Sequence, residues 1–142
     1  MLILIDSSVY LSSLIKEEKY HLNSVNFFTA LEKKGNFKIV VPQIVLYEVL
    51  NKIAQLSSGV NLLSIYQSFM ESKEMNLFYF DSKFNQFYLD SLNKFILKTS
   101  DLLIAITALY HQCPLISWDQ KLLKQADKKF DVYTPKQYLQ IL

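Results

Sequence analysis

Short, continuous apolar runs alternate along this chain with longer segments in which apolar residues recur every three or four positions. Continuous apolar runs are typical of strands buried on both faces of a sheet, and the longer period is typical of helices with one buried face. The pattern predicts five strands, over residues 2–5, 37–41, 75–80, 113–116 and 132–133. Because strands and helices alternate, we expect a three-layer α/β/α sandwich around a central, mainly parallel five-stranded sheet.

The segments between the strands predict helices with recognisable ends. Ser7 or Ser8 is expected to cap the first helix, Pro42 to lie in the first turn of the third, and Thr99 or Ser100 to cap the helix over 101–110. That last helix is apolar nearly all round, so it should be central. The predicted helices cover residues 7–16, 22–34 and 42–56, a stretch ending at 71 after a break at Ser57-Ser58-Gly59, a stretch after Asp81, 101–110, 120–126 and a last turn from Thr134.

Composition indicates one globular domain over residues 1–142, with 51% hydrophobic and 20% charged residues. The single cysteine, Cys113, excludes an intrachain disulfide and fits a reducing cytosol, where it is most simply a small buried hydrophobe. No apolar stretch approaches the length of a transmembrane helix. We therefore expect a cytoplasmic protein without a membrane partner.

Four acidic residues lie where an apolar run gives way to the next element: Asp6, Glu48, Asp101 and Asp119. In open α/β sheets, ligands bind outside the carboxyl ends of the strands, and all four acids are expected at that edge. Carboxylates that close together cannot all stay ionised without a cation. The chain has no His or Cys cluster for zinc, so an all-oxygen set favours Mg²⁺ or Mn²⁺.

Each acid also has a purely structural interpretation. Asp6 is typical of a turn or a helix cap, and Asp119 of the N-cap of the helix that follows it. Glu48 lies on the polar side of its helix, a position typical of a solvated side chain, although a polar side can also line a cleft.

Asp101 is typical of an acid favoured by the dipole at a helix N-terminus. On a helical wheel, however, its neighbours are Ala105 and Ala108, a small-residue face that leaves space for a metal and waters. Asp81 also follows a strand, but its better interpretation is an N-cap.

The formal net charge is +2, and all 15 basic residues are lysine. A cationic rim around an acidic pocket suits a polyanionic substrate, although lysines are also the ordinary way to solvate a surface. Lysine meets phosphate as a point charge without the fork of arginine. The candidates for phosphate contacts are Lys16, Lys19, Lys98 and Lys121.

The ordered set of four acids resembles the PIN domain, a nuclease family that includes the VapC-type toxins of toxin–antitoxin pairs. The matching segments are LILIDSSVYL, VPQIVLYEVLNKI, SDLLIAITALYHQCPLISWDQKL and VYTPKQYL. The resemblance implies that Asp6, Glu48, Asp101 and Asp119 are the catalytic, metal-binding acids. It also matches Ser117 to a polar residue two before the last Asp, and Ser7 and Ser8 to the small polar residues after the first. Trp118 and the absence of arginine depart from the family pattern.

This resemblance implies a Mg²⁺- or Mn²⁺-dependent ribonuclease, with RNA as substrate, an antitoxin as partner and a homodimer as the assembly. A stand-alone RNA-processing nuclease is an alternative. So is a non-catalytic PIN-like module that binds RNA or protein. A receiver-like phospho-acceptor is disfavoured, because serines follow Asp6 where that class of protein has paired acids.

Overall fold

The computed structural model describes residues 1–56, 59–126 and 129–142. Its centre is a sheet of five strands in the order β3-β2-β1-β4-β5, and every neighbouring pair is parallel. The predicted five-stranded sheet is therefore confirmed. The strands are β1 (Leu2–Ile5), β2 (Lys38–Pro42), β3 (Met75–Phe78), β4 (Leu115–Ile116) and β5 (Val132–Tyr133).

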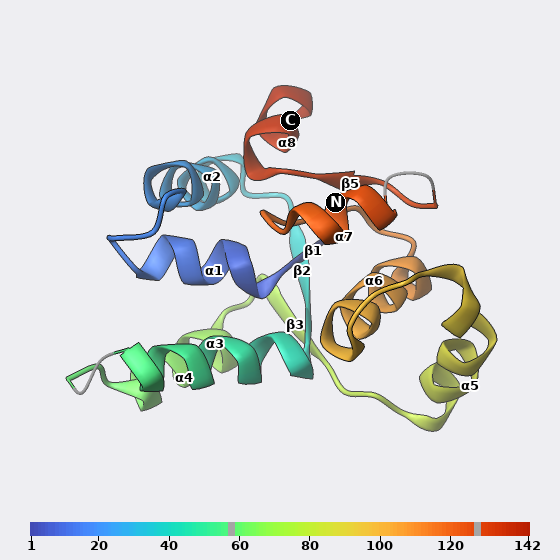
Figure 1. Cartoon of the computed structure of the whole chain (residues 1–142). Helices are drawn as coiled ribbons and strands as arrows, with labels where there is room; N and C mark the ends of the chain where they lie inside the picture. Colours follow the sequence, from blue (N-terminus) through green and yellow to red (C-terminus); the bar gives the residue numbers. More distant parts are fainter. Residues whose placement is uncertain (57–58, 127–128) are drawn as a thin grey trace.

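Helices cover both faces of this sheet. Figure 1 shows α1 to α4 on one side of the strands and α5 and α6 on the other, which confirms the three-layer arrangement. The predicted break at Ser57-Ser58 lies outside the described residues. The helices are α1 (Ser7–Leu14), α2 (His21–Lys34), α3 (Gln43–Leu56), α4 (Leu62–Glu71), α5 (Ser82–Ser91), α6 (Thr99–His111), α7 (Gln120–Ala126) and α8 (Pro135–Ile141), with a 3₁₀ turn η1 (Leu92–Lys94).

The strand order reverses beside β1. From β1 the chain moves outward to β2 and β3, then returns to place β4 on the other side of β1. The helices that follow β1 and those that precede β4 lie on opposite faces, so the connections diverge between these two strands (Figure 1). Such a switch point leaves a crevice at the carboxyl edge of an open α/β sheet.

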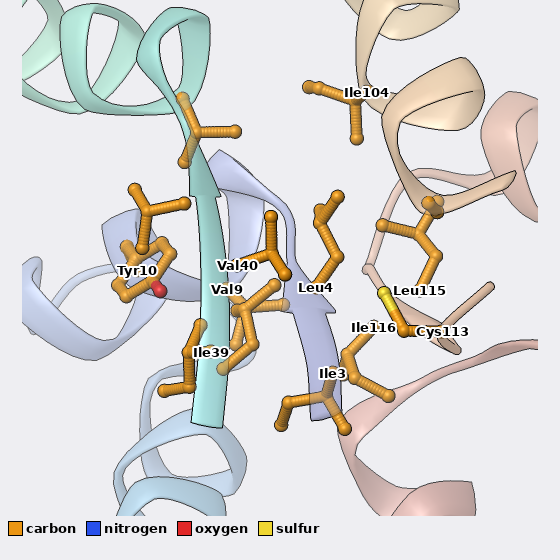
Figure 2. Packing of buried hydrophobic residues seen from close by; sticks show 14 of the residues in the cluster. Ile3, Leu4, Val9, Tyr10, Ile39, Val40, Ile104, Cys113, Leu115 and Ile116 are labelled. Atoms are coloured by element: carbon orange, nitrogen blue, oxygen red, sulfur yellow. The ribbon is translucent and has the colours of Figure 1, made fainter. Parts of the chain in front are cut away.

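The core is built on β1 and on α6. Leu4 pairs with Val40 of β2 and with Leu115 of β4, and its side chain is fully buried. Figure 2 shows these side chains filling the space between the strands and the flanking helices, with Ile104 of α6 nearby. The buried positions of α6 include Ala105 and Ala108, which confirms that this helix is central. Among the described residues, no helix is long and apolar enough to cross a membrane.

Two predicted helix caps are wrong. Ser7 and Ser8 lie inside α1, and Asp6 occupies its N-cap position without a capping hydrogen bond. Thr99 and Ser100 likewise lie inside α6, which begins after Lys98. Residues that already have helical backbone cannot act as the N-cap, because capping requires an extended backbone.

Pro42 was expected in a helix but ends β2, where it pairs with Phe78 of β3. A proline lacks an N–H and so fits the end of a strand. The strands β3 and β4 are shorter than predicted. By contrast, the predicted cap at Asp81 is confirmed, since its side chain accepts a hydrogen bond of 2.8 Å from the Phe84 backbone N–H.

Candidate active site

The ends of β1 and β4 bring Asp6 and Ser117 together. Backbone hydrogen bonding continues one residue past each strand: Asp6 N–H donates to the Ile116 carbonyl at 2.9 Å, and Ser117 N–H donates to the Tyr133 carbonyl at 3.0 Å. Both side chains therefore start at the carboxyl edge of the sheet, beside the switch point. Asp6 is 4% exposed and Ser117 is fully buried.

Serine hydroxyls satisfy the buried carboxylate of Asp6. Its Oδ2 accepts hydrogen bonds from Ser8 Oγ at 2.6 Å and from Ser117 Oγ at 2.8 Å. A longer contact of 3.4 Å joins Ser7 Oγ to Oδ1. Hydrogen bonds of this kind stabilise the charged form of a buried carboxyl group. They concentrate on one oxygen and leave Oδ1 more open to a further ligand.

Ser7 connects Asp6 to Glu48. Its hydroxyl donates a short hydrogen bond of 2.7 Å to Glu48 Oε2. Glu48 lies in the second turn of α3. Glu48 is half-buried, and Val45 and Val49 on the opposite side of the helix are in the core. The polar side of α3 therefore lines the site, so the interpretation of Glu48 as a freely solvated residue is wrong.

Asp119 has a structural task as well as its place at the site. Its Oδ1 accepts the backbone N–H groups of Lys121 at 2.8 Å and Leu122 at 2.9 Å, the pattern of an N-cap for α7. Its own N–H donates to Ser117 Oγ at 2.9 Å. The turn between β4 and α7 is thus tied to the hydroxyl that also binds Asp6.

Asp101 lies in the first turn of α6, and its electrostatic surroundings show that the acids converge. Burial raises the pKa of its carboxyl group, and the charges of Asp119, Asp6 and Glu48, in decreasing order, raise the pKa further. Lys98 opposes this shift. The charges of the other three expected acids therefore all act on Asp101.

The space beside Asp101 differs from the expectation. Ala105 and Ala108 are fully buried, and neither lines the hollow that adjoins Asp101. The opening is instead a hollow of about 400 Å³ next to Asp101, which runs towards α7. Its lining residues are Ile96, Leu97, Lys98, Asp101, Lys121, Lys124 and Gln125.

The four candidate lysines do not gather in one place. Lys98 and Lys121 line the hollow beside Asp101, together with Lys124, which the sequence analysis missed. The spacing of Lys124 three residues after Lys121 on α7 is the signal that points to it. Lys16 lines a different hollow. The ammonium group of Lys19 lies 5.1 Å from the centre of the Tyr20 ring.

The donor chemistry of the site suits a hard divalent cation. All four acids supply carboxylate oxygens, and the pKa of Asp101 is raised by its burial and then by the charges of the other three. The described residues contain no group of three or more His, Cys, Asp or Glu side chains arranged to hold a metal ion. Mg²⁺ needs no such group, since it commonly takes one or two carboxylates and keeps several waters. The residues therefore fit a largely hydrated Mg²⁺ or Mn²⁺.

A doubly wound α/β fold with an acidic crevice at its switch point defines a class of protein that binds ligands at the carboxyl edge of its sheet. The family profile described as PIN domain matches residues 3–129. The chain belongs to the PIN domain family.

Solved structures of VapC toxins and their complexes share the fold. VapBC2 from Rickettsia felis, bound to a promoter DNA fragment, aligns at a TM-score of 0.69 and 19% identity over 94% of this chain and 98% of that one. VapBC-1 from nontypeable Haemophilus influenzae aligns at 0.67 and 16% identity, over 96% and 99%. VapC20 from Mycobacterium tuberculosis, a toxin that cleaves the sarcin–ricin loop, aligns at 0.68 and 11% identity, over 90% and 95%. No curated protein matches the chain.

Proposed function

We propose that this protein is a metal-dependent ribonuclease that hydrolyses RNA phosphodiester bonds, and that it is the toxin of a type II toxin–antitoxin pair. One observation carries the proposal: Asp101 is partly buried in the first turn of α6, and burial together with the charges of Asp119, Asp6 and Glu48 raises the pKa of its carboxyl group. A divalent cation relieves that repulsion. Membership of the PIN domain family supports the same reaction class.

Each acid has a proposed role. Asp6 and Asp101 hold Mg²⁺ or Mn²⁺ directly, and Glu48 and Asp119 complete the site through waters. When bound, the metal supplies an activated water and neutralises charge that develops on the phosphate.

Serine hydroxyls hold these acids in a defined orientation. Ser8 and Ser117 both donate to Oδ2 of Asp6, so Oδ1 is the oxygen that would hold a metal. Ser7 orients Glu48 by a hydrogen bond to its Oε2. Asp119 uses Oδ1 to cap α7, so its Oδ2 is the oxygen that would complete the site.

The lysines that line the hollow beside Asp101 favour a polyanionic substrate. Three lysines, Lys98, Lys121 and Lys124, line it next to the acidic edge. A phosphate that approaches Asp101 through this hollow meets point charges without the paired hydrogen bonds that arginine forms. We therefore propose that the lysines attract RNA by charge and contribute little to the choice of sequence.

The toxin role rests on the structural similarity to VapC proteins, several of which were solved with their antitoxins. For this chain, an antitoxin partner and a homodimeric assembly are parts of the proposal. Expression of the chain alone should arrest cell growth, and co-expression of a small protein encoded immediately upstream should relieve the arrest. Growth arrest without such a neighbouring protein favours a stand-alone processing nuclease.

Cleavage of labelled RNA tests the catalytic proposal. The parent, Asp101→Asn and the control Asp90→Asn are compared over a broad panel of RNAs with Mn²⁺ or Mg²⁺, and Mn²⁺ binding is measured by calorimetry. Asp90 is an exposed acid on α5, away from the site. We expect Asp101→Asn to reduce kcat by more than about 100-fold, since groups that merely support a metal ligand are worth about 10–100-fold.

The control should cut RNA like the parent. A parent that binds no Mn²⁺ and cuts no RNA overturns the enzyme proposal and favours a non-catalytic PIN-like module. Equal cleavage by the parent and Asp101→Asn overturns the proposed site.

A further inference from the structure

Trp118 lies between Ser117 and Asp119, and it is held at both its backbone and its side chain. Its backbone N–H donates to Ser8 Oγ at 3.1 Å, the same hydroxyl that donates to Asp6. Its indole Nε1–H donates to Ser24 Oγ at 2.8 Å. A single residue thus connects the β4–α7 turn to both α1 and α2.

The indole hydrogen bond is the first in a series of hydrogen bonds that all donate in the same direction. Ser24 Oγ lies 2.6 Å from Ser12 Oγ, and Ser12 Oγ donates to the Val9 carbonyl at 3.1 Å. An indole N–H can only donate and a carbonyl can only accept. Trp118 therefore donates to Ser24, Ser24 donates to Ser12, and Ser12 donates to the Val9 carbonyl. Ser12 and Ser24 are both buried. This series of hydrogen bonds ends on α1, the helix whose first turn carries Ser7 and Ser8.

The flat face of the indole is also occupied. The Tyr20 ring stacks on Trp118 with a centroid distance of 4.1 Å and an interplanar angle of 8°. Lys19 lies above the Tyr20 ring. Tyr20 immediately precedes α2, so the stack and the Ser24 hydrogen bond anchor the indole to the same end of one helix.

We infer that Trp118 is a positioning residue, which fixes Ser117 and Asp119 relative to Asp6. This inference rests on the proposed function. Only three residues separate β4 from α7, so neither neighbour of Trp118 can shift while the indole stays in place. A displacement of about 1 Å at a reacting site is enough to cost about 100-fold in rate.

The test compares the parent with Ser24→Ala, Ser12→Ala and Trp118→Phe. Ser24→Ala removes the acceptor of the indole N–H, and Ser12→Ala breaks the series of hydrogen bonds one step further on. Trp118→Phe keeps a ring for the stack and removes the donor. The matched control is Ser13→Ala, because among the described residues the Ser13 hydroxyl donates only to the Tyr10 carbonyl within α1.

Hydrogen exchange of the indole N–H is the direct measurement, and its NMR signal is unambiguous because the chain has one tryptophan. We expect slow exchange in the parent and in Ser13→Ala, and at least tenfold faster exchange in Ser24→Ala, about the ratio that a net hydrogen-bond contribution near 1.4 kcal/mol produces. The backbone amide signals of Ser117 and Asp119 should move in Ser24→Ala and Ser12→Ala and stay in place in Ser13→Ala.

Calorimetry and kinetics then test whether the contacts of Trp118 affect the candidate site. In all three test variants we expect Mn²⁺ affinity to fall by about 10–100-fold, the range found for groups that support a metal ligand. The kcat should fall while KM stays within a factor of two, because a positioning residue does not touch RNA. Parent-like indole exchange in Ser24→Ala overturns the inference, and so does faster exchange with unchanged Mn²⁺ affinity and kcat.

The two proposals fail differently. A parent that neither binds Mn²⁺ nor cuts RNA defeats the proposed function, and the amide signals of Ser117 and Asp119 still decide the role of Trp118. If Ser24→Ala does not fold, Ser12→Ala gives the exchange comparison, and Trp118→Phe gives the comparison of Mn²⁺ affinity and kcat.

Discussion

Ser117, which follows β4, donates a hydrogen bond of 2.8 Å to Asp6, which follows β1, although 111 residues separate them. Both side chains are buried, and the Asp119 N–H shares the Ser117 hydroxyl. This one hydroxyl therefore binds the first acid of the candidate site through its proton and the last acid through its oxygen.

Loss of that hydroxyl should destabilise the protein. Ser117→Ala removes one donor from Asp6 and the only side-chain acceptor of the Asp119 N–H among the described residues. Hydrogen bonds to a charged group contribute about 1.5–3 kcal/mol, so we expect urea unfolding to show a loss in that range. The control is Ser68→Ala, whose exposed hydroxyl bonds only to the Ile65 carbonyl. An equal effect of the two substitutions would contradict the importance of the shared hydroxyl.

The two tasks of Asp119 can be separated by substitution. Asparagine caps helices about as well as aspartate, so Asp119→Asn should retain stability and lose activity. Asp119→Ala should lose activity and also about 1 kcal/mol of stability, because α7 loses its cap. Thermal unfolding and RNA cleavage of both variants check this. Equal melting temperatures of the two variants would show that the cap contributes nothing.

Salt dependence of RNA binding should identify the lysines that meet phosphate. The test uses the Asp101→Asn protein, which is expected to leave RNA intact, with Lys98→Gln, Lys121→Gln or Lys124→Gln added. Each lost contact to single-stranded RNA should reduce the slope of log K against log salt by about 0.7. The control is Lys33→Gln at the far end of α2. Slopes that match this control would exclude the hollow as the RNA path.

Asp101 should reduce the stability of the protein at neutral pH. Because the pKa of its carboxyl group is raised from 3.8 by burial and by the other acids, the charged form is disfavoured in the folded state. At pH values above 3.8 the unfolded chain binds fewer protons than the folded protein, so stability falls as pH rises through the raised pKa. Without added metal, Asp101→Asn should melt at a higher temperature than the parent near neutral pH.

That advantage should disappear at low pH, where the carboxyl group is protonated in both states. The control is Asp90→Asn, which should melt like the parent throughout. A melting temperature of Asp101→Asn equal to that of the parent near neutral pH would contradict the mutual repulsion of the acids.

His111 should make stability fall on mild acidification. Burial lowers the pKa of His111 from 6.5, and its Nε2 has no hydrogen-bond partner among the described residues. Its ring stands edge-on to the Phe78 ring, with 4.6 Å between the ring centroids. The unfolded chain binds the proton more readily, so stability is complete above about pH 6.5 and falls towards the lowered pKa. His111→Phe keeps an aromatic contact with Phe78 and should flatten this dependence. Parallel stability curves for variant and parent would contradict the prediction.

The apolar pattern predicted the sheet because strands buried on both faces leave little ambiguity, as in β1. It failed at local starts such as Thr99, because side-chain type does not reveal which backbone is already helical. It also failed at Glu48, since helical periodicity separates polar from apolar sides but cannot tell a cleft from solvent.

Tertiary contacts supply what periodicity cannot. The partner of Glu48 is Ser7, 41 residues away along the chain. Trp118 illustrates the same limit: its hydrogen bond reaches Ser24 across 94 residues, and no local pattern signals it.

The placement of β4 beside β1 has a consequence for synthesis of the chain. Strands β1, β2 and β3 all precede β4, and synthesis delivers the chain from its N-terminus. A nascent chain that has exposed α3 already displays Asp6 and Glu48, yet it lacks α6 and the Ser117 hydroxyl. The acidic edge therefore cannot be completed before Asp119 has left the translating ribosome, long after Asp6 has emerged.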